Sequence, residues 1–283
     1  MSRFTLRRTL PVAGAAVVAA AATLALALPG TADAHRAGPA PAVPAPPAAP
    51  TSADQIQNLD QVRTAIEAYY GDTPTTTPDP VNGATTLHTF SPTGAYAKEM
   101  GGIVTNAERY LDRAARPRGH HSSATKAILL DVDDTTLNTY NYEIYSNFVY
   151  NPTTNAAFVN SGAFPAVPHM VDLVDYARAK GYAIFFLTGR PGTQRAGTVA
   201  NLASVGYPSV APDHLYLKDY TADTWLSSCA PSCTTTQYKS LTRQHIESLG
   251  YDIVGNFGDQ FSDLNGGYSD QTFKLPNPMY YLP

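Results

Sequence analysis

Three carboxylates stand within four residues in the segment Asp131-Val132-Asp133-Asp134-Thr135. Residues two apart in an extended segment point to the same side, so we expect Asp131 and Asp133 to face one ligand together. Two carboxylates this close repel each other unless a cation lies between them, and a hard divalent ion suits oxygen ligands of this kind. The motif therefore predicts a metal-assisted chemistry at the end of this segment.

Two other interpretations of the motif are weaker. A calcium loop of the EF-hand kind needs Gly at its sixth position and Glu at its twelfth, but Thr136 and Tyr142 stand there. The apolar run 127–130 also predicts a strand before the motif, whereas a calcium loop follows a helix. An aspartate at a strand end often only forms a turn or caps a helix, so a catalytic interpretation needs further polar residues at the same place.

Those further residues follow other predicted strands. Apolar runs and glycine stops alternate along the chain and predict strands over 127–130, 183–187, 214–217 and 252–257, and helices over 169–180, 193–205 and 237–249. This alternation predicts an α/β fold with a mainly parallel sheet and helices on both faces. Asp131, Thr188 and Asp259 stand at strand ends, and ligands of such sheets bind beyond the carboxyl ends of the strands. We therefore expect these three residues to meet at one edge of the sheet.

Outside this core, the sequence predicts two N-terminal helices and one more strand. The first helix is predicted over 52–70, because Ser52 and Gln55 match a capping box and apolar residues follow at helical spacing. The second is predicted over 96–114, and the loop between the two is rich in Thr, Pro, Gly and Asp. Residues 280–282 are predicted to add an edge strand.

The first 51 residues are not expected to join the folded domain. Residues 1–34 combine a positive start with an apolar run, 12–28, and a small-x-small cleavage site, which is typical of an export signal. A membrane anchor is the alternative, but the run is short and rich in alanine for a span. Arg7-Arg8 leaves both the general secretory (Sec) and the twin-arginine routes open. Residues 35–51 carry six prolines among alanines and predict an extended, disordered linker.

We expect a secreted, extracellular protein with no membrane span after cleavage. Its residues 52–283 suit one domain, with a helical part over 52–116 and a core over 117–283. Cleavage after residue 34 removes three Arg and one Asp from 19 basic and 23 acidic residues, which leaves 16 against 22 and a net charge of −6. A charge of this sign predicts no nucleic-acid-binding surface.

Two cysteines, Cys229 and Cys233, are predicted to form a small disulfide, as an exported chain favours. Zinc is disfavoured because His214 is the nearest preceding histidine and a zinc site needs more ligands. The seven histidines of the chain show no ligand spacing.

Four motifs carry a resemblance to a known family. They are LLDVDDT (129–135), FLTGR (186–190), YKS (238–240) and GNFGDQFSD (255–263). With these motifs the sequence resembles the haloacid dehalogenase (HAD) superfamily from about residue 52 onward, and within it the exported and plant acid phosphatases related to vegetative storage proteins. The superfamily commonly has Gly where this chain has Asp134, and an acidic residue there is typical of the acid phosphatase branch. The resemblance implies a Rossmann-like, doubly wound sheet with N-terminal helices and a small cap insertion.

The resemblance also implies a role for each motif residue. Asp131 matches the nucleophile that forms an aspartyl-phosphate, and Asp133 matches the general acid and base. Thr188 and the backbone amide of Gly189 match the phosphate-binding group. Lys239 matches the lysine that stabilises the phosphoryl oxygens as charge develops.

Mg²⁺ is the implied cofactor. The resemblance implies Asp131, the backbone carbonyl of Asp133, and Asp259 as its ligands. Asp263 matches either a second acidic ligand or a residue that orients Lys239.

Two basic residues and one aromatic group leave alternatives open. Lys218 also stands at a strand end, but Lys239 is preferred because it opens a helix and helix N-termini favour phosphate. Arg190 is either a substrate contact or a surface salt-bridge partner. Between Asp131 and Thr188, five aromatics either line the substrate entrance or, as such clusters more often do, pack in the core: Tyr140, Tyr142, Tyr145, Phe148 and Tyr150. No large cap fits in this span, so we expect a fairly open entrance.

These features predict a secreted, Mg²⁺-dependent acid phosphatase that hydrolyses phosphate monoesters, which are its small-molecule partners. A binding or storage protein on the same scaffold is the first alternative, and the presence of Asp131 argues against it. A phosphotransferase is the second, because an acceptor alcohol and water can attack the same intermediate. The sequence leaves the natural substrate, the pH optimum and the oligomeric state open.

Overall fold

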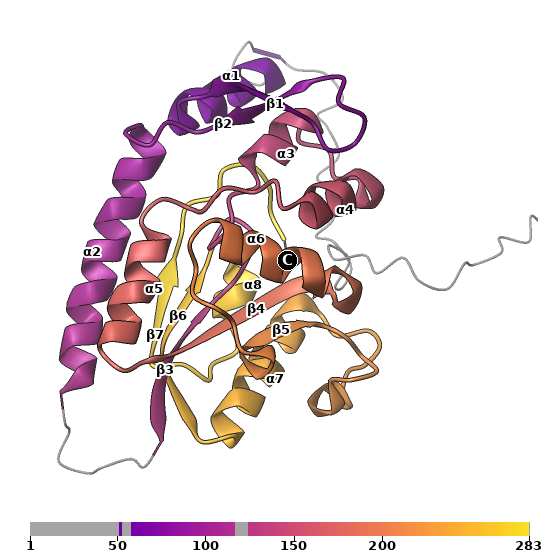
Figure 1. Ribbon diagram of the computed structural model, residues 1–283. Coiled ribbons are helices and arrows are strands. Elements are labelled where there is room, and N and C mark those ends of the chain that lie inside the picture. The colour runs from indigo at the N-terminus through magenta and orange to yellow at the C-terminus, as the bar shows by residue number, and fades with distance from the viewer. Residues whose placement is uncertain (1–50, 53–57, 117–123, 283) are drawn as a thin grey trace, which may run out of the picture. The chain divides into compact units, whose positions relative to one another are not determined.

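A five-stranded parallel sheet forms the centre of the fold (Figure 1). The computed structural model describes residues 51–52, 58–116 and 124–282, so the predicted signal peptide and nearly all of the linker lie outside the described residues. The strand order is β5-β4-β3-β6-β7, and every neighbouring pair is parallel. The bounds are β3 (Thr125–Leu130), β4 (Ala183–Pro191), β5 (Leu215–Lys218), β6 (Tyr251–Gly258) and β7 (Gln271–Lys274). The prediction of a parallel α/β sheet is confirmed.

The central strand β3 shows why the sheet is covered on both faces. Ile128 and Leu130 belong to one buried cluster, while Ala127 and Leu129 belong to a second cluster on the opposite face. Side chains alternate between the faces of a strand, so a continuous apolar run buries both of them.

Helices cover each face. On one face lie α2 (Ala95–Ala115) and α5 (Met170–Ala179), while α7 (Thr235–Ser248) packs against β4 and β6 from the other (Figure 1). The remaining helices of the core are α6 (Arg195–Ser204), the short α8 (Phe261–Leu264) and the 3₁₀ turns η2 (Gly192–Gln194), η3 (Pro212–His214) and η4 (Thr224–Leu226). A capping box between Thr234 and Gln237 starts α7, which brings the first turn of this helix to the sheet edge where the strands end.

The N-terminal part contains an element that the sequence did not predict. The helix predicted over 52–70 is α1 (Leu59–Tyr70), and its cap is Asn58, whose side chain accepts a hydrogen bond from the Gln61 amide at 3.1 Å. The capping box at Ser52 was therefore wrong as a helix start, and Gln55 lies outside the described residues. The Thr-rich loop that follows forms an antiparallel hairpin, β1 (Thr73–Pro78) and β2 (Thr86–Thr89).

The segment between β3 and α5 holds two short helices, α3 (Tyr140–Tyr145) and α4 (Pro152–Ser161). Its aromatics pack in the core or against it, and none of them lines the pocket described below, so the core interpretation of this cluster holds. Two of them, Tyr140 and Tyr142, are fully buried.

The last described residues form no strand. Residues 280–282 were predicted as an edge strand, but the edge of the sheet is β7, and the chain after it crosses the ends of the strands as irregular backbone. Tyr280 turns its hydroxyl to Asp134 instead, as described below.

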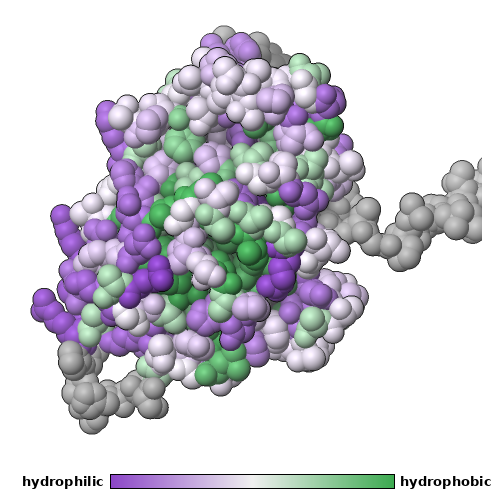
Figure 2. All heavy atoms as spheres, viewed as in Figure 1, coloured by the Kyte–Doolittle hydropathy of each residue, from purple (hydrophilic) through white to green (hydrophobic). Residues whose placement is uncertain are grey.

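Two surface features complete the fold. Cys229 and Cys233 form a disulfide in the segment before α7. In the view of Figure 2, hydrophobic residues gather in the middle and hydrophilic residues along the side where α2 lies. Within the described residues, no helix combines the length and apolar character that crossing a membrane requires.

Candidate active site

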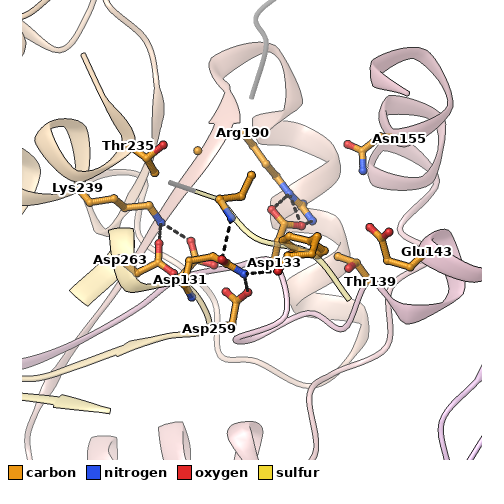
Figure 3. Close-up of a pocket in the computed structure, with 14 residues that line it drawn as sticks. Asp131, Asp133, Thr139, Glu143, Asn155, Arg190, Thr235, Lys239, Asp259 and Asp263 are labelled. Carbon is orange, nitrogen blue, oxygen red and sulfur yellow. Dashed lines mark hydrogen bonds and ion pairs between the residues drawn. The ribbon is translucent and has the colours of Figure 1, made fainter. Parts of the chain in front are cut away.

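A pocket lies where β3, β4 and β6 end, and the strand-end carboxylates form its floor (Figure 3). Asp131 directly follows β3 and Asp259 directly follows β6. Asp133 and Gly189 also line the pocket, together with Lys239 from α7 and Asp263 from α8. Residues that are far apart in the sequence therefore meet at one sheet edge, as the strand-end pattern predicts.

Asp131 is held by a buried lysine. Its side chain is 9 % exposed. The Lys239 ammonium donates a hydrogen bond to Asp131 Oδ1 and another, of 2.6 Å, to the carbonyl oxygen of Leu187. The same ammonium forms an ion pair of 3.0 Å with Asp263 Oδ1. Burial alone would lower the pKa of Lys239, but Asp131 and Asp263 outweigh burial and raise it.

Three carboxylates form one cluster, and two of them, Asp131 and Asp263, pair with this ammonium. Ligand oxygens of Asp131, Asp259 and Asp263 all lie within 4.8 Å of one another, and all three residues are buried. Burial and then Asp263 raise the pKa of Asp259 to about 8, and the same two causes raise the pKa of Asp131 well above its usual range. Because the cluster holds three carboxylates and one lysine, Lys239 alone can balance only part of the negative charge when all three are ionised.

This donor set fits a hard divalent cation. It consists of oxygens only, the kind of ligand that Mg²⁺ and Ca²⁺ take, and an ion there would supply the missing positive charge. Asp259 is already oriented, because Gln260 Nε2 and Asn277 Nδ2 donate to its Oδ2 at 2.6 and 2.7 Å. Hydrogen bonds of this kind hold a ligand in place before a metal arrives. The carboxylate that joins Asp131 and Asp259 in this cluster is Asp263.

The Asp133 side chain has a different partner. The Arg190 guanidinium donates to it in a forked arrangement, with Nη2 at 2.6 Å from Oδ1 and Nε at 3.1 Å from Oδ2. Arg190 is 3 % exposed, and its Nη1 also donates to Thr198 Oγ1 at 2.9 Å. The structure thus places Arg190 in a buried ion pair inside the site rather than in a surface salt bridge. A forked, charge-assisted pair fixes both position and orientation of the carboxylate.

Thr188 lies behind the pocket wall. Its hydroxyl is 3.5 Å from Asp133 Oδ2 and accepts a hydrogen bond of 3.1 Å from the Arg190 amide. The next residue, Gly189, lines the pocket itself. In this arrangement Thr188 supports Asp133, and the backbone at Gly189 is what a ligand would meet.

The two candidate lysines lie in different surroundings. Lys239 reaches into the pocket. Lys218, at the end of β5, is not among the residues lining the pocket, and its ammonium lies 5.3 Å from the ring centre of Tyr220 and 5.8 Å from that of Tyr238. Of the two lysines, Lys239 is therefore the one that can contact a phosphate in this pocket.

Asp134 braces the loop after Asp131. Its φ angle is +55°, in the left-handed region where glycine is favoured and aspartate is tolerated. The carboxylate accepts bonds from the Thr139 amide at 2.9 Å, from the Thr139 hydroxyl, and from the Tyr280 hydroxyl at 2.7 Å. Burial nevertheless raises the pKa of Asp134 to about 6. An acidic residue at this glycine-like position thus ties the loop to the C-terminal segment.

Several pocket residues were missed by the sequence analysis. Glu143 from α3 and Asn155 from α4 line one side of the pocket, and Tyr280 and Leu282 contribute to its wall. Arg243 on α7 holds the chain after α8, donating to the Asp263 carbonyl oxygen at 2.5 Å and to that of Gly267 at 2.7 Å. The unusual acidic side chain within the aromatic run 140–150 was the available signal for Glu143.

Comparison with known proteins identifies the family. Residues 58–283 match the family described as HAD superfamily, subfamily IIIB (acid phosphatase). The chain is 38 % identical over 135 residues to the stem 28 kDa glycoprotein of Glycine max, and this alignment covers 47 % of the present chain and 50 % of the glycoprotein. It is 35 % identical over 158 residues to acid phosphatase 1 of Solanum lycopersicum, covering 54 % and 58 %. Vegetative storage protein 1 of Arabidopsis thaliana is 32 % identical over 161 residues, covering 55 % of each chain.

These alignments span between half and three fifths of the length of the relatives. Among solved structures, the class C acid phosphatase of Bacillus anthracis superposes with a TM-score of 0.54 at 23 % identity, covering 67 % of this chain and 80 % of that one, which supports the fold. The family match extends over most of the chain and includes every residue of the pocket. The chain therefore belongs to the HAD superfamily, subfamily IIIB, the acid phosphatases.

Proposed function

We propose that the protein is a secreted, Mg²⁺-dependent phosphatase that hydrolyses phosphate monoesters with Asp131 as its nucleophile. The observation that carries the proposal is the buried cluster of Asp131, Asp259 and Asp263 at the sheet edge, in which Asp131 and Asp263 pair with Lys239. The family match and the relative named acid phosphatase 1 support the same reaction. Export is supported by the N-terminal sequence pattern and by relatives that are named glycoproteins.

Each side chain has a role in two steps. In the first, an Asp131 oxygen attacks phosphorus, the bond to the leaving oxygen breaks, and that oxygen takes the proton of the Asp133 carboxyl group. In the second, the Asp133 carboxylate takes a proton from water, whose oxygen attacks phosphorus and displaces Asp131. Phosphate then leaves, and both aspartates are back in their starting states.

The surroundings support this division of roles. Arg190 stabilises the negative charge that Asp133 carries after it donates its proton. Lys239 and Gly189 line the pocket, and in this proposal the ammonium and the Gly189 backbone bind phosphoryl oxygens as their charge develops. Mg²⁺, held by Asp131, Asp259 and the carbonyl of Asp133, would offset the repulsion between an anionic nucleophile and an anionic substrate. Asp263 orients Lys239 and adds charge beside the cation.

The test is phosphate release from an aryl phosphate by purified protein, with and without a chelator. We expect chelation to abolish activity and Mg²⁺ to restore it better than Ca²⁺, which prefers more ligands. Asp131→Asn should lower kcat by at least about 10⁴-fold while the far-UV circular dichroism spectrum stays unchanged.

The matched control is Asp223→Asn, which alters another buried aspartate that does not line the pocket. It should retain the activity of the unaltered protein. A folded, metal-loaded protein without activity from acidic to neutral pH would contradict the proposal. That result would favour a storage role, which the relatives named vegetative storage proteins also suggest.

A further inference from the structure

One side of the pocket has no role in the chemistry described so far. It consists of Glu143 from α3 and Asn155 from α4, which we call the insertion wall. In Figure 3 these two side chains lie on one side of Asp133, and Lys239 and Thr235 lie on the other. The insertion wall therefore faces the part of the pocket opposite the lysine.

The acceptor groups of the insertion wall have no partner among the described residues. Glu143 is only 7 % exposed, yet its carboxyl group makes no hydrogen bond and no ion pair there, and the Asn155 side-chain amide makes none either. The nearby guanidinium of Arg190 is already committed to Asp133. Carboxyl groups of residues this buried usually accept hydrogen bonds, whereas that of Glu143 borders the pocket without a protein donor in the described part of the chain.

The charges around Glu143 make a donor more favourable still. Burial first, and then the neighbouring Asp134 and Asp133, raise its pKa to about 8. Because these neighbours are acids, the local electrostatic potential favours a ligand group that donates a hydrogen bond or carries positive charge. By contrast, Asp131, Asp134 and Asp259 all accept hydrogen bonds from protein groups.

The geometry of the reaction says which part of a ligand would arrive there. In phosphoryl transfer the attacking and leaving oxygens lie roughly in line with phosphorus between them. With phosphate bound beside Asp131 and Lys239, the rest of the substrate must extend toward another side of the pocket. Asp133, which protonates the leaving oxygen in the proposed mechanism, lies between Lys239 and the insertion wall in Figure 3.

We propose that the insertion wall binds the leaving group of the substrate and selects alcohols that carry a hydrogen-bond donor, a hydroxyl or an ammonium group, close to the ester oxygen. Glu143 accepts the donor and Asn155 supplies a second polar contact. This inference rests on the proposed phosphatase function and names its substrate class. Both residues are specificity determinants, since neither takes part in bond making or breaking.

Three monoesters of nearly equal size test the proposal: O-phosphoethanolamine, 2-hydroxyethyl phosphate and propyl phosphate. Their leaving groups end in ammonium, hydroxyl and methyl. We expect the unaltered protein to prefer the two donor-bearing esters over propyl phosphate by roughly tenfold or more in kcat/KM, because a site built for a donor rejects the analogue that lacks it. Comparing the ratios between variants cancels the intrinsic reactivity of each ester.

The variants separate charge from hydrogen bonding. Glu143→Leu should bring the kcat/KM of both donor-bearing esters close to that of propyl phosphate, mainly through a change in KM. Glu143→Gln keeps an acceptor but cannot ionise, so above pH 8, where Glu143 is charged, it should lower the ammonium preference more than the hydroxyl preference. Glu99→Gln changes an exposed acid on α2, outside the pocket, and should leave all ratios as they are.

The outcomes distinguish this inference from the proposed function. An aryl phosphate without a donor reports catalysis alone, and its hydrolysis should continue in Glu143→Leu. If the aryl phosphate is not hydrolysed even by the unaltered protein, the phosphatase function itself fails. If it is hydrolysed but the donor preferences are the same in Glu143→Leu and the unaltered protein, the insertion wall does not bind the leaving group and the inference is overturned.

Discussion

The two sides of the pocket differ in their hydrogen bonds: the carboxylates of the sheet edge have protein partners, and the carboxyl group of the insertion wall has none among the described residues. At the sheet edge, Asp131 is bonded to Lys239, and Asp133 is bonded to Arg190. Asp259 likewise accepts from Gln260 and Asn277. On the insertion wall, Glu143 is a buried residue as well, but its carboxyl group has no such partner among the described residues.

This difference separates groups that are fixed from groups that wait for a ligand. Groups that stabilise developing charge act best when they are held in place before the reaction, because no free energy is then spent on reorienting them. A buried group without a partner gains its hydrogen bond only when a ligand binds, so it contributes to recognition. Substitutions at the sheet edge should therefore affect catalysis, and substitutions on the insertion wall should affect substrate recognition.

The largest effect is expected from removing the charge that fixes the sheet edge. Lys239→Met leaves the buried carboxylates of Asp131 and Asp263 without their ammonium, so it should lower kcat by about 10²–10³-fold. It should also lower the free energy of unfolding by about 3–5 kcal/mol, because breaking a buried ion pair leaves uncompensated charge. Phosphate release and urea denaturation measure the two effects.

Lys218→Met is the matched control at the neighbouring strand end. The Lys218 ammonium lies over the faces of two tyrosine rings, so its loss should change the unfolding free energy by no more than about 1 kcal/mol and leave kcat close to that of the unaltered protein. If the two variants behaved alike, Lys239 would not hold the cluster together, and the comparison between the two sides would fail.

A smaller effect on stability should appear at the insertion wall. Glu143 has a pKa of about 8 in the folded protein against 4.5 for the free side chain. The fold thus favours the neutral form, and the free energy of unfolding should fall as pH rises from 4.5 toward 8, then level off. Glu143→Gln removes this dependence, so its stability relative to the unaltered protein should rise by about 2–4 kcal/mol over that window.

Urea denaturation of both proteins at pH 5 and pH 8 measures the difference. At pH 5 the two should be nearly equally stable, since Glu143 is mostly neutral in the fold. Equal stability at pH 8 as well would mean that the Glu143 carboxylate is solvated or paired, and the contrast with the sheet edge would disappear.

The sheet edge could be predicted from sequence because its cause is local. Apolar runs define strands, a parallel sheet aligns their carboxyl ends, and Asp131, Thr188 and Asp259 stand where those runs stop. The family motifs added Lys239. None of these steps needs knowledge of how distant side chains pack.

The insertion wall and the N-terminal hairpin could not be predicted, because their cause is tertiary. Five of the six residues of β1 are exposed, so no alternation of apolar and polar residues marks the strand. Whether Glu143 faces solvent or a pocket depends on how α3 packs. The partner of Arg190 depends on the same packing, and so a surface salt bridge was an equally good expectation.

The smallest effect should come from the C-terminal segment, which supports the sheet edge from outside it. Tyr280 was predicted in a strand, but its hydroxyl donates to Asp134 at 2.7 Å and its ring lines the pocket. Tyr280→Phe should lower the free energy of unfolding by about 1 kcal/mol, the net worth of one hydrogen bond. The loss in kcat/KM should be less than about tenfold, because the Thr139 amide still holds Asp134.

Tyr281→Phe, one residue on and 60 % exposed, is the control and should change neither quantity. If Tyr280→Phe matched that control, the Tyr280 hydrogen bond would not be needed to hold Asp134. If it lowered activity as much as Lys239→Met does, Tyr280 would instead belong to the fixed, catalytic side of the pocket.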